Sequence, residues 1–144
     1  MNRLRTHLVK DRDEIRMIAY RDSDKHAQSE LENVFDNGGK LWIAEENLRS
    51  IAIAGVLPIR EGVGHFVFAC ADGAFDRPYD LIHAIRKGIH ACARMYSLFR
   101  LQFMVEDGFS ERLRFADFLG FKVEGIHPKS GPNGTTWISY GRVE

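Results

Sequence analysis

Few of the histidine, cysteine and serine residues have the spacing of a known catalytic or metal motif. His83 and His90 are seven residues apart on a predicted helix, which places them on one face but too far apart to chelate one metal ion. The His-x-x-x-His pairing of helical zinc sites is absent, as are a GxSxG motif and a P-loop. Cys70 and Cys92 lie in apolar segments without CxxC spacing, which indicates buried, reduced thiols. The sequence therefore predicts no metal site and no thiol chemistry.

Side chains that can transfer a proton lie at the ends of predicted strands. They are Glu45 and Glu46 at the end of one strand, His65 at the start of another, and Asp72 just after it. Carboxylates and imidazole are common general bases. Each of these residues also has a simpler interpretation, as a solvated group at a strand end, and both interpretations stay open.

An acidic loop leads into the longest predicted helix. Residues 72–80 read Asp-Gly-Ala-Phe-Asp-Arg-Pro-Tyr-Asp, and Pro78 suits the first helical position. Free N–H groups and the dipole at a helix N-terminus favour anions, and Arg77 adds a positive charge. The carboxylates of Asp72, Asp76 and Asp80 would repel an anion bound at this loop, since each like-charge contact at ~4 Å costs about 1 kcal/mol in water. The alternative is that Asp76 caps the helix and the loop binds nothing.

Hydrophobic patterning predicts an α+β chain that forms one domain over residues 1–144. Asp11 and Glu14 have the spacing of a capping box. Ser110 can cap a short helix that Gly120 ends. The expected strands cover residues 6–9, 41–44, 51–56, 65–71, 101–105, 121–124 and 135–140; the helices begin near residues 11, 22, 78 and 110; and residues 126–134 form a loop.

Three short motifs occur in a fixed order along this pattern. They are Arg21-x-x-Asp24; Leu41-Trp42-Ile43-Ala44-Glu45 followed by Ile51-Ala52-Ile53-Ala54-Gly55-Val56; and Arg114-Phe115-Ala116-Asp117-Phe118-Leu119-Gly120-Phe121. With the order of elements they resemble the GNAT superfamily of N-acetyltransferases over nearly the whole chain. The resemblance is closest to short phage-encoded GNAT-like proteins, some of which are internal virion or head-assembly proteins. It implies a mixed, mostly antiparallel sheet of six or seven strands with helices on both faces.

The resemblance also implies a cofactor and a site. Acetyl-CoA would lie in a splay between the strands at 65–71 and 100–105, and its acyl group would pass to an amine. Its pantetheine arm would pair with the backbone of the first strand, and its diphosphate would lie on the loop that follows. The cofactor-binding residues implied are Phe68, Ala69, Cys70, Ala71, Gly73 and Arg77, and the candidate catalytic bases are His65 and Glu45.

The chain departs from the family pattern at two places. The diphosphate loop has Gly73 where several spaced glycines are usual. Ala116 stands where many members carry a tyrosine that protonates the leaving thiolate, and alanine has no proton to give. Ser110 replaces the asparagine that usually opens this helix.

Two functional hypotheses follow from these features. The first is an acetyl-CoA-dependent N-acyltransferase in the host cytoplasm that acts on a small-molecule or protein amine. The second is a catalytically inactive GNAT-fold protein of a phage particle or its assembly, which binds phage structural proteins. A fold does not decide between them.

Composition excludes several other classes of partner. Lys and Arg number 20, as do Asp and Glu, so the formal net charge is zero and a nucleic-acid partner is not expected. No apolar run approaches the ~20 residues of a membrane helix, and the N-terminus lacks an apolar signal region. Low net charge permits self-association. The last strand and Trp137 could support a homodimer, although core packing explains Trp137 equally well.

Overall fold

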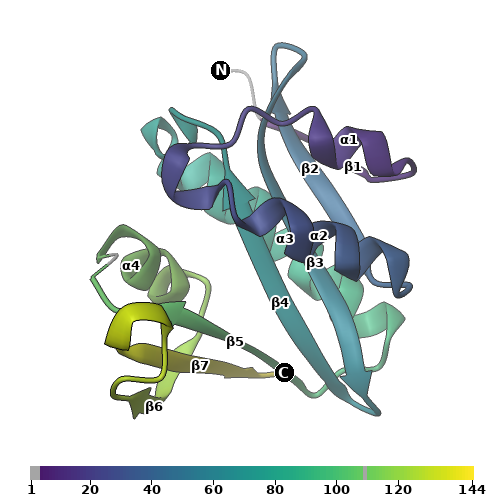
Figure 1. Ribbon diagram of the computed structural model, residues 1–144. Helices are drawn as coiled ribbons and strands as arrows, with labels where there is room; N and C mark the ends of the chain where they lie inside the picture. Colours follow the sequence, from purple (N-terminus) through teal and green to yellow (C-terminus); the bar gives the residue numbers. More distant parts are fainter. Residues whose placement is uncertain (1–3, 109) are drawn as a thin grey trace.

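The computed structural model describes residues 4–108 and 110–144, except for the side chains of Ser110 and Glu111. The described residues form one sheet of seven strands with helices on both of its faces (Figure 1). The predicted α+β class is thus confirmed.

The strands and helices follow one another in the order that the hydrophobic pattern predicted. In chain order they are β1 (Arg5–Leu8), α1 (Arg12–Arg16), a 3₁₀ turn (Asp22–Asp24), α2 (Ala27–Asp36), β2 (Lys40–Glu46), β3 (Arg49–Arg60), β4 (Val63–Cys70), a second 3₁₀ turn (Ala74–Asp76), α3 (Pro78–Met95), β5 (Arg100–Glu106), α4 (Ser110–Phe118), β6 (Lys122–His127), a third 3₁₀ turn (Pro132–Gly134) and β7 (Trp137–Val143).

The order of strands in the sheet is β1-β2-β3-β4-β5-β7-β6. β4 and β5 run parallel, whereas each of the other neighbouring pairs is antiparallel. The parallel step requires a crossover, which α3 provides. The prediction of a mixed, mostly antiparallel sheet is confirmed.

Local signals in the sequence account for several boundaries. Asp11 caps α1, accepting a hydrogen bond from the Asp13 N–H at 2.9 Å, and Glu14 completes the capping box. Asn47 and Leu48 form the tight turn between β2 and β3 with positive φ angles of 49° and 68°. Pro78 begins α3, as predicted.

Other boundaries correct the predictions. β3 continues through Pro58, beyond the strand predicted over residues 51–56, because a register shift between Pro58 and Arg60 accommodates the proline. β6 runs to His127, into the predicted loop at 126–134. Asp76 does not cap α3, since Arg77 occupies the N-cap position and makes no side-chain cap hydrogen bond. The predicted cap at Ser110 lies outside the described side chains.

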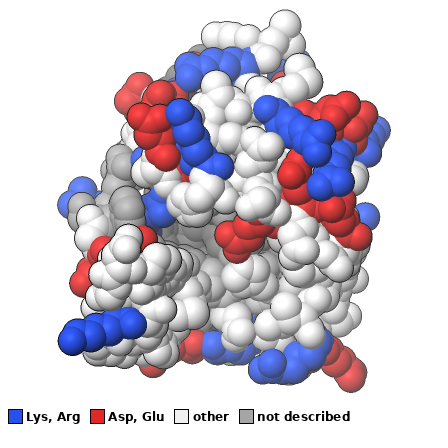
Figure 2. All heavy atoms as spheres, viewed as in Figure 1, with Lys and Arg blue, Asp and Glu red and all other residues white. Residues whose placement is uncertain are grey.

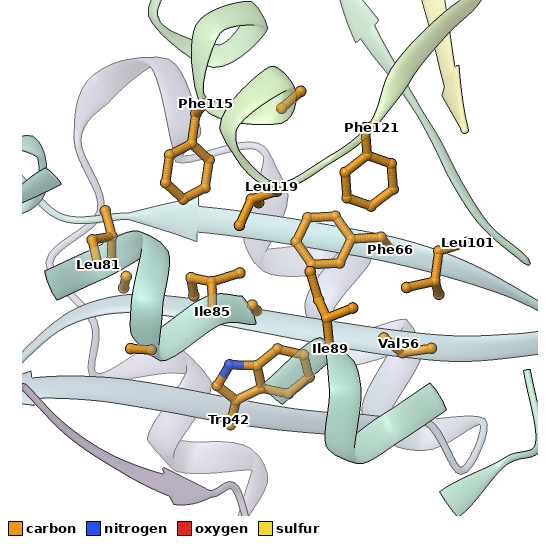
Figure 3. Close-up of a cluster of buried hydrophobic side chains, with 14 of the residues drawn as sticks. Trp42, Val56, Phe66, Leu81, Ile85, Ile89, Leu101, Phe115, Leu119 and Phe121 are labelled. Carbon is orange, nitrogen blue, oxygen red and sulfur yellow. The ribbon is translucent and has the colours of Figure 1, made fainter. Parts of the chain in front are cut away.

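Two apolar cores lie on opposite faces of the sheet. On one face α1 and α2 bury Ile15 and Leu31 against Ile43 and Ile53. On the other face α3 and α4 cover a larger cluster, drawn in Figure 3, in which α4 points Phe115 and Leu119 toward β4 and α3. Cys92 belongs to this second core, where burial raises the pKa of its thiol to about 11. Among the described residues, no helix is long and apolar enough to span a membrane.

Gly88 tests how closely α3 packs on the sheet. A Cβ at this position would lie only 2.0 Å from Trp42 Cε2, which is too close for two carbon atoms. Trp42 is buried, with 4% of its surface exposed. Glycine to alanine in a helix ordinarily stabilises by up to about 1 kcal/mol. Here we expect Gly88→Ala to destabilise the protein by about 1–3 kcal/mol because the core is overpacked. Chemical denaturation measures the change, with Lys87→Ala on the exposed face of α3 as control. A stabilised Gly88→Ala protein would contradict this packing.

Candidate functional site

The two parallel strands at the centre of the sheet separate after a short pairing. Their register covers Val63–Arg100, Gly64–Leu101 and His65–Gln102 and then ends. Beyond this point β4 continues to Cys70 and β5 to Glu106, and the two ribbons diverge clearly in Figure 1. A wedge-shaped opening with β4 on one side and β5 on the other is therefore built into the sheet.

The edge of β4 that faces this opening has free backbone groups at Phe68. Cys70 shows which residues face that edge, because its N–H donates to Asp24 Oδ2 at 2.8 Å and its carbonyl accepts from the Arg21 N–H at 3.0 Å. Backbone groups of successive strand residues alternate between the two edges, so those of Phe68 point the same way as those of Cys70. The β4–β5 register does not extend to Phe68, so its N–H and carbonyl have no partner strand within residues 4–108 and 110–144.

The other residues predicted to hold a pantetheine arm have their backbone groups engaged. Ala69 pairs with Ile53 of β3, and the Ala71 N–H donates to the Ile51 carbonyl at 2.8 Å. Cys70 is held by Arg21 and Asp24, as above. Of the four predicted strand residues, Phe68 is the one turned to the opening with its hydrogen-bonding groups available.

A cavity of about 170 Å³ occupies the opening. Figure 2 shows it as a hollow bordered mainly by uncharged atoms, with acidic side chains at its edge. Its two ends differ in chemistry. The polar end is lined by Asp24, His26, Glu30, His65, Glu106 and Arg112, and the apolar end by side chains of β4, β5 and α4.

The polar end contains a histidine–carboxylate pair. His65 Nε2 lies 3.0 Å from Glu30 Oε1, which joins β4 to α2. The His65 and Glu30 side chains are 32% and 50% exposed, so both are in reach of solvent and of a ligand. Glu106 lies at the end of β5 across the opening, with no ion-pair partner among the described residues. Two carboxylates therefore face the space beside His65.

Three phenylalanines close the opening on the side of α3 and α4. The Phe68 ring stacks on Phe115 of α4 with centroids 4.8 Å apart, and Phe75 meets Phe115 edge to face at 5.4 Å. Phe75 belongs to the acidic loop, so the aromatic cluster ties that loop to β4 and α4.

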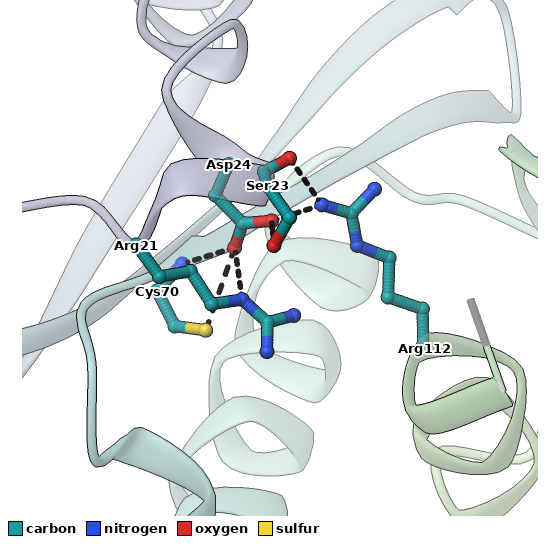
Figure 4. A network of polar contacts seen from close by, with 5 residues as sticks. All are labelled: Arg21, Ser23, Asp24, Cys70 and Arg112. Atoms are coloured by element: carbon teal, nitrogen blue, oxygen red, sulfur yellow. Dashed lines mark hydrogen bonds and ion pairs between the residues drawn. The ribbon is translucent and has the colours of Figure 1, made fainter.

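Asp24, which lines the cavity, connects the Asp22–Asp24 turn with β4 and α4 (Figure 4). Its carboxylate is 3% exposed and contacts Arg112 of α4, the Arg21 guanidinium at 3.2 Å and the Cys70 N–H at 2.8 Å. Arg112 also donates to the Ser23 carbonyl at 2.6 Å. Arg21 in turn lies 4.8 Å from the centre of the Phe75 ring. The buried carboxylate thus joins the Asp22–Asp24 turn, β4 and α4.

The acidic loop orients its one arginine toward carboxylates. Arg77 contacts Asp80 at 2.7 Å and Glu46 at 3.2 Å, and its hydrogen bond to Asp80 raises the pKa of Arg77. Gly73 adopts the left-handed conformation with φ 85°. The charge that would favour a diphosphate here is therefore already paired.

The structure brings some predicted site residues together and separates others. His65 and Phe68 line the cavity, whereas Glu45 does not. Glu45 Oε1 lies 2.9 Å from His7 Nδ1 in a contact that ties β2 to β1. Gly73 and Arg77 lie beside the opening in the loop but outside the cavity lining.

Sequence reasoning missed five polar residues of the site, among them His26, which was not considered. Glu30, Glu106 and Arg112 gave no signal, because each resembles an ordinary charged residue on a helix or at a strand end. Asp24 was recognised within the Arg21-x-x-Asp24 motif but was given no role. Ala116 was expected to lack a proton donor, and the structure places it in the cavity wall, 2% exposed. Tyr140 stacks on Phe103 within the core, where burial raises the pKa of its hydroxyl.

Comparison with solved structures identifies the architecture. A GNAT family acetyltransferase from Elizabethkingia anophelis with acetyl-CoA bound matches with a TM-score of 0.73 at 13% identity, over 100% of both chains. A Bacillus subtilis acetyltransferase in complex with CoA gives 0.73 at 13% identity, over 98% of this chain and 99% of that one. A mutant of the spermidine N-acetyltransferase SpeG from Vibrio cholerae gives 0.72 at 15% identity, over 98% and 94%.

The chain has the GNAT fold. No protein-family model matches it, and no curated protein matches it by sequence. At 12–15% identity the likeness extends to the fold. What the GNAT-fold site of this chain does must be argued from its own residues.

The contacts of Asp24 predict that removing its charge strongly lowers the stability of the protein. Asp24→Asn leaves Arg21 and Arg112 facing each other without the shared carboxylate. We expect a loss of about 3 kcal/mol, the lower end for a broken buried ion pair, because the arginine side chains keep 15% and 20% exposure. Denaturant unfolding measures it. Asp22→Asn is the matched control, since the Asp22 side chain is 96% exposed and should change stability by less than about 0.5 kcal/mol. Equal effects of the two substitutions would contradict the role of Asp24.

Proposed function

We propose that this protein is an acyl-CoA-dependent N-acyltransferase that acts on an amine. The observation that supports it best is the cavity where β4 and β5 diverge, with the unpaired Phe68 backbone on one side and the His65–Glu30 pair at its polar end. An extended strand edge can hydrogen-bond the amides of a pantetheine arm, and an attacking amine needs a base within reach. The GNAT fold of the chain is consistent with both.

The residues fit a CoA arm at one place and oppose it at others. The Phe68 N–H and carbonyl offer the pairing edge, and the N-terminus of α3 offers free N–H groups. Against this, Asp24 and Arg21 hold the backbone of Cys70, and Asp80 and Glu46 hold Arg77. We infer that CoA binds with modest affinity through its pantetheine arm, with little help from the diphosphate loop.

His65 is the proposed general base. When bound, acyl-CoA supplies the acyl group as a thioester. His65 takes the proton that the amine nitrogen loses as it attacks, directly or through one water, and Glu30 orients the imidazole. Glu106 faces the same space and attracts the amine in its cationic form, which gives one proton to solvent before the neutral nitrogen attacks. Ala116 donates no proton, so protonation of the leaving thiolate falls to the imidazolium or to water.

A second candidate function is a non-catalytic role through protein–protein contacts. The observation that favours it is the closed β4 edge at Cys70, together with the aromatic packing of Phe75 on Phe115. In this alternative the protein belongs to a phage particle or its assembly, as its resemblance to phage-encoded GNAT-like proteins suggests. Co-purification with particles in the absence of any CoA binding would favour this alternative over the enzyme.

CoA binding tests the enzyme proposal directly. We expect free CoA to raise the melting temperature, because ligand at one hundred times its dissociation constant stabilises the folded state by about 2.7 kcal/mol. Isothermal calorimetry gives the dissociation constant. Arg77→Glu adds a negative charge to the acidic loop and should weaken binding by repelling the CoA diphosphate, whereas Arg94→Glu, the same charge change at the other end of α3, should not. The absence of a shift at millimolar CoA would contradict the proposal.

The substitution His65→Gln tests the role of His65 as general base. We expect the turnover of an amine acceptor to fall by about 10²-fold, since a positioned general base contributes 10²–10⁴. The dissociation constant of CoA should stay within about twofold, because the imidazole contacts Glu30 and not the Phe68 edge. His90→Gln on the exposed face of α3 is the control. Unchanged turnover of His65→Gln would assign the base elsewhere.

A further inference from the structure

The far end of β5 places a carboxylate and an indole side by side at the cavity. Glu106, the last residue of β5, lies directly opposite Trp137, the first residue of β7, in the antiparallel register. Residues opposite each other share a face of the sheet, with Cβ atoms about 4.5–5.5 Å apart. Both residues line the cavity and both are half-buried, so a ligand reaches them from solvent. A group bound between them therefore needs no enclosed space.

The loop between β6 and β7 supports the indole of Trp137. A Cβ at Gly131 in this loop would lie 2.0 Å from Trp137 Nε1, so the ring lies against the glycine and a larger residue there would displace it. A tryptophan ring attracts a cation to its face, and a carboxylate forms charge-assisted hydrogen bonds with an ammonium group. The pair of Glu106 and Trp137 therefore has the chemistry of a site for an organic cation.

The charges of the cavity lining also favour a cation. The charged residues in the lining are Asp24, Glu30, Glu106 and Arg112. Asp24 and Arg112 contact each other, so their charges cancel, and Glu30 is hydrogen-bonded to His65. Within the part of the chain that the structure describes, Glu106 has no cationic partner. Its negative charge is therefore available to a ligand.

Glu106 and His65 are too far apart to bind the same nitrogen atom. His65 lies opposite Gln102 in the last register pair of β4 and β5, and Glu106 follows four residues later on β5. At about 3.3 Å per residue this is about 13 Å along the strand. Residues an even number of positions apart face the same side of a sheet, so Glu106 lies on the face where His65 meets Glu30 of α2. A nitrogen beside His65 thus leaves Glu106 and Trp137 to a second group.

We propose that the acceptor of this protein is an aliphatic amine with a second, cationic nitrogen, which Glu106 and Trp137 bind while the first nitrogen reacts beside His65. This inference rests on the proposed acyltransferase function and names the class of its acceptor. With a hydrogen bond of about 2.9 Å at each end, about 7–8 Å remain between the two nitrogens, which a chain of about five carbons spans.

The second nitrogen stays charged throughout the reaction. The first nitrogen gives one proton to solvent and attacks the thioester carbonyl as a neutral amine. As the new carbon–nitrogen bond forms, its second proton passes to His65. The carbon–sulfur bond then breaks, and the thiolate takes a proton from the imidazolium or from water. The product is a monoacylated amine that keeps its positive charge at Glu106.

A matched series of amines tests the inference on the full chain with acetyl-CoA as donor. Pentylamine, 1,5-diaminopentane and 5-aminopentanoate share the reacting amine and carry a methyl, an ammonium or a carboxylate group at the far end. We expect kcat/KM for the diamine to exceed that for pentylamine by about tenfold or more, since hydrogen bonds to charged groups contribute that much, and 5-aminopentanoate to react most slowly. This gain exceeds the statistical advantage of two equivalent nitrogens.

The outcomes separate this inference from the proposed function. A diamine that gains no more than the statistical advantage, or a faster reaction of 5-aminopentanoate, would overturn the inference and leave the proposed function intact. If CoA binds but none of the amines is acylated, the inference is likewise overturned. If CoA does not bind and no amine reacts, the proposed function fails and this inference fails with it.

Two substitutions assign the preference to this end of the cavity. Glu106→Gln should lower kcat/KM for 1,5-diaminopentane by about tenfold, chiefly through KM, and that for pentylamine by a smaller factor. Trp137→Leu keeps an apolar side chain but removes the aromatic ring, so it should also raise KM for the diamine. Glu61→Gln, at the exposed turn between β3 and β4, is the control and should change neither value. A diamine preference that survives Glu106→Gln, or a diamine KM that Trp137→Leu leaves unchanged, would overturn the inference.

Discussion

The site depends on one feature of the sheet, the early end of the pairing between β4 and β5. Three register pairs join these strands, and the parallel ladder then stops. An unpaired strand edge inside a sheet needs hydrogen-bonding partners, since buried backbone groups are costly to leave unsatisfied. At Cys70 the protein provides these partners itself through Arg21 and Asp24, and at Phe68 none of the described residues does so. That difference leaves a short segment of edge on which a ligand could pair.

Charge and aromatic packing together hold the opening in shape. Asp24 would be costly to bury alone, and the contacts to Arg21, Arg112 and the Cys70 N–H offset that cost. Because Arg112 belongs to α4, the same carboxylate ties the C-terminal half of the sheet to the Asp22–Asp24 turn. A second connection comes from the aromatic contacts among Phe75, Phe68 and Phe115, which join the acidic loop, β4 and α4. The two sets of contacts meet at Arg21, whose guanidinium lies over Phe75.

Much of the fold could be predicted from the sequence, because local signals specify it. The Asp11–Glu14 capping box and the proline at the start of α3 each act within a few residues. The length of β3 could not be predicted, since Pro58 is tolerated through a register shift that depends on pairing with β4. The site was predicted in part. His65 and Phe68 follow from their positions on β4, but Glu30, Glu106 and Arg112 meet there through tertiary packing of α2, β5 and α4, which leaves no trace in residue spacing.

The central claim is that the open edge of β4 at Phe68 binds the thioester arm of an acyl-CoA. Backbone amide NMR of the ¹⁵N-labelled protein, titrated with CoA, tests it most directly. The account predicts a saturable shift of the Phe68 amide, larger than that of Ala69, whose backbone pairs with β3. Shifts confined to the exposed face of α3, or none at millimolar CoA, would contradict it.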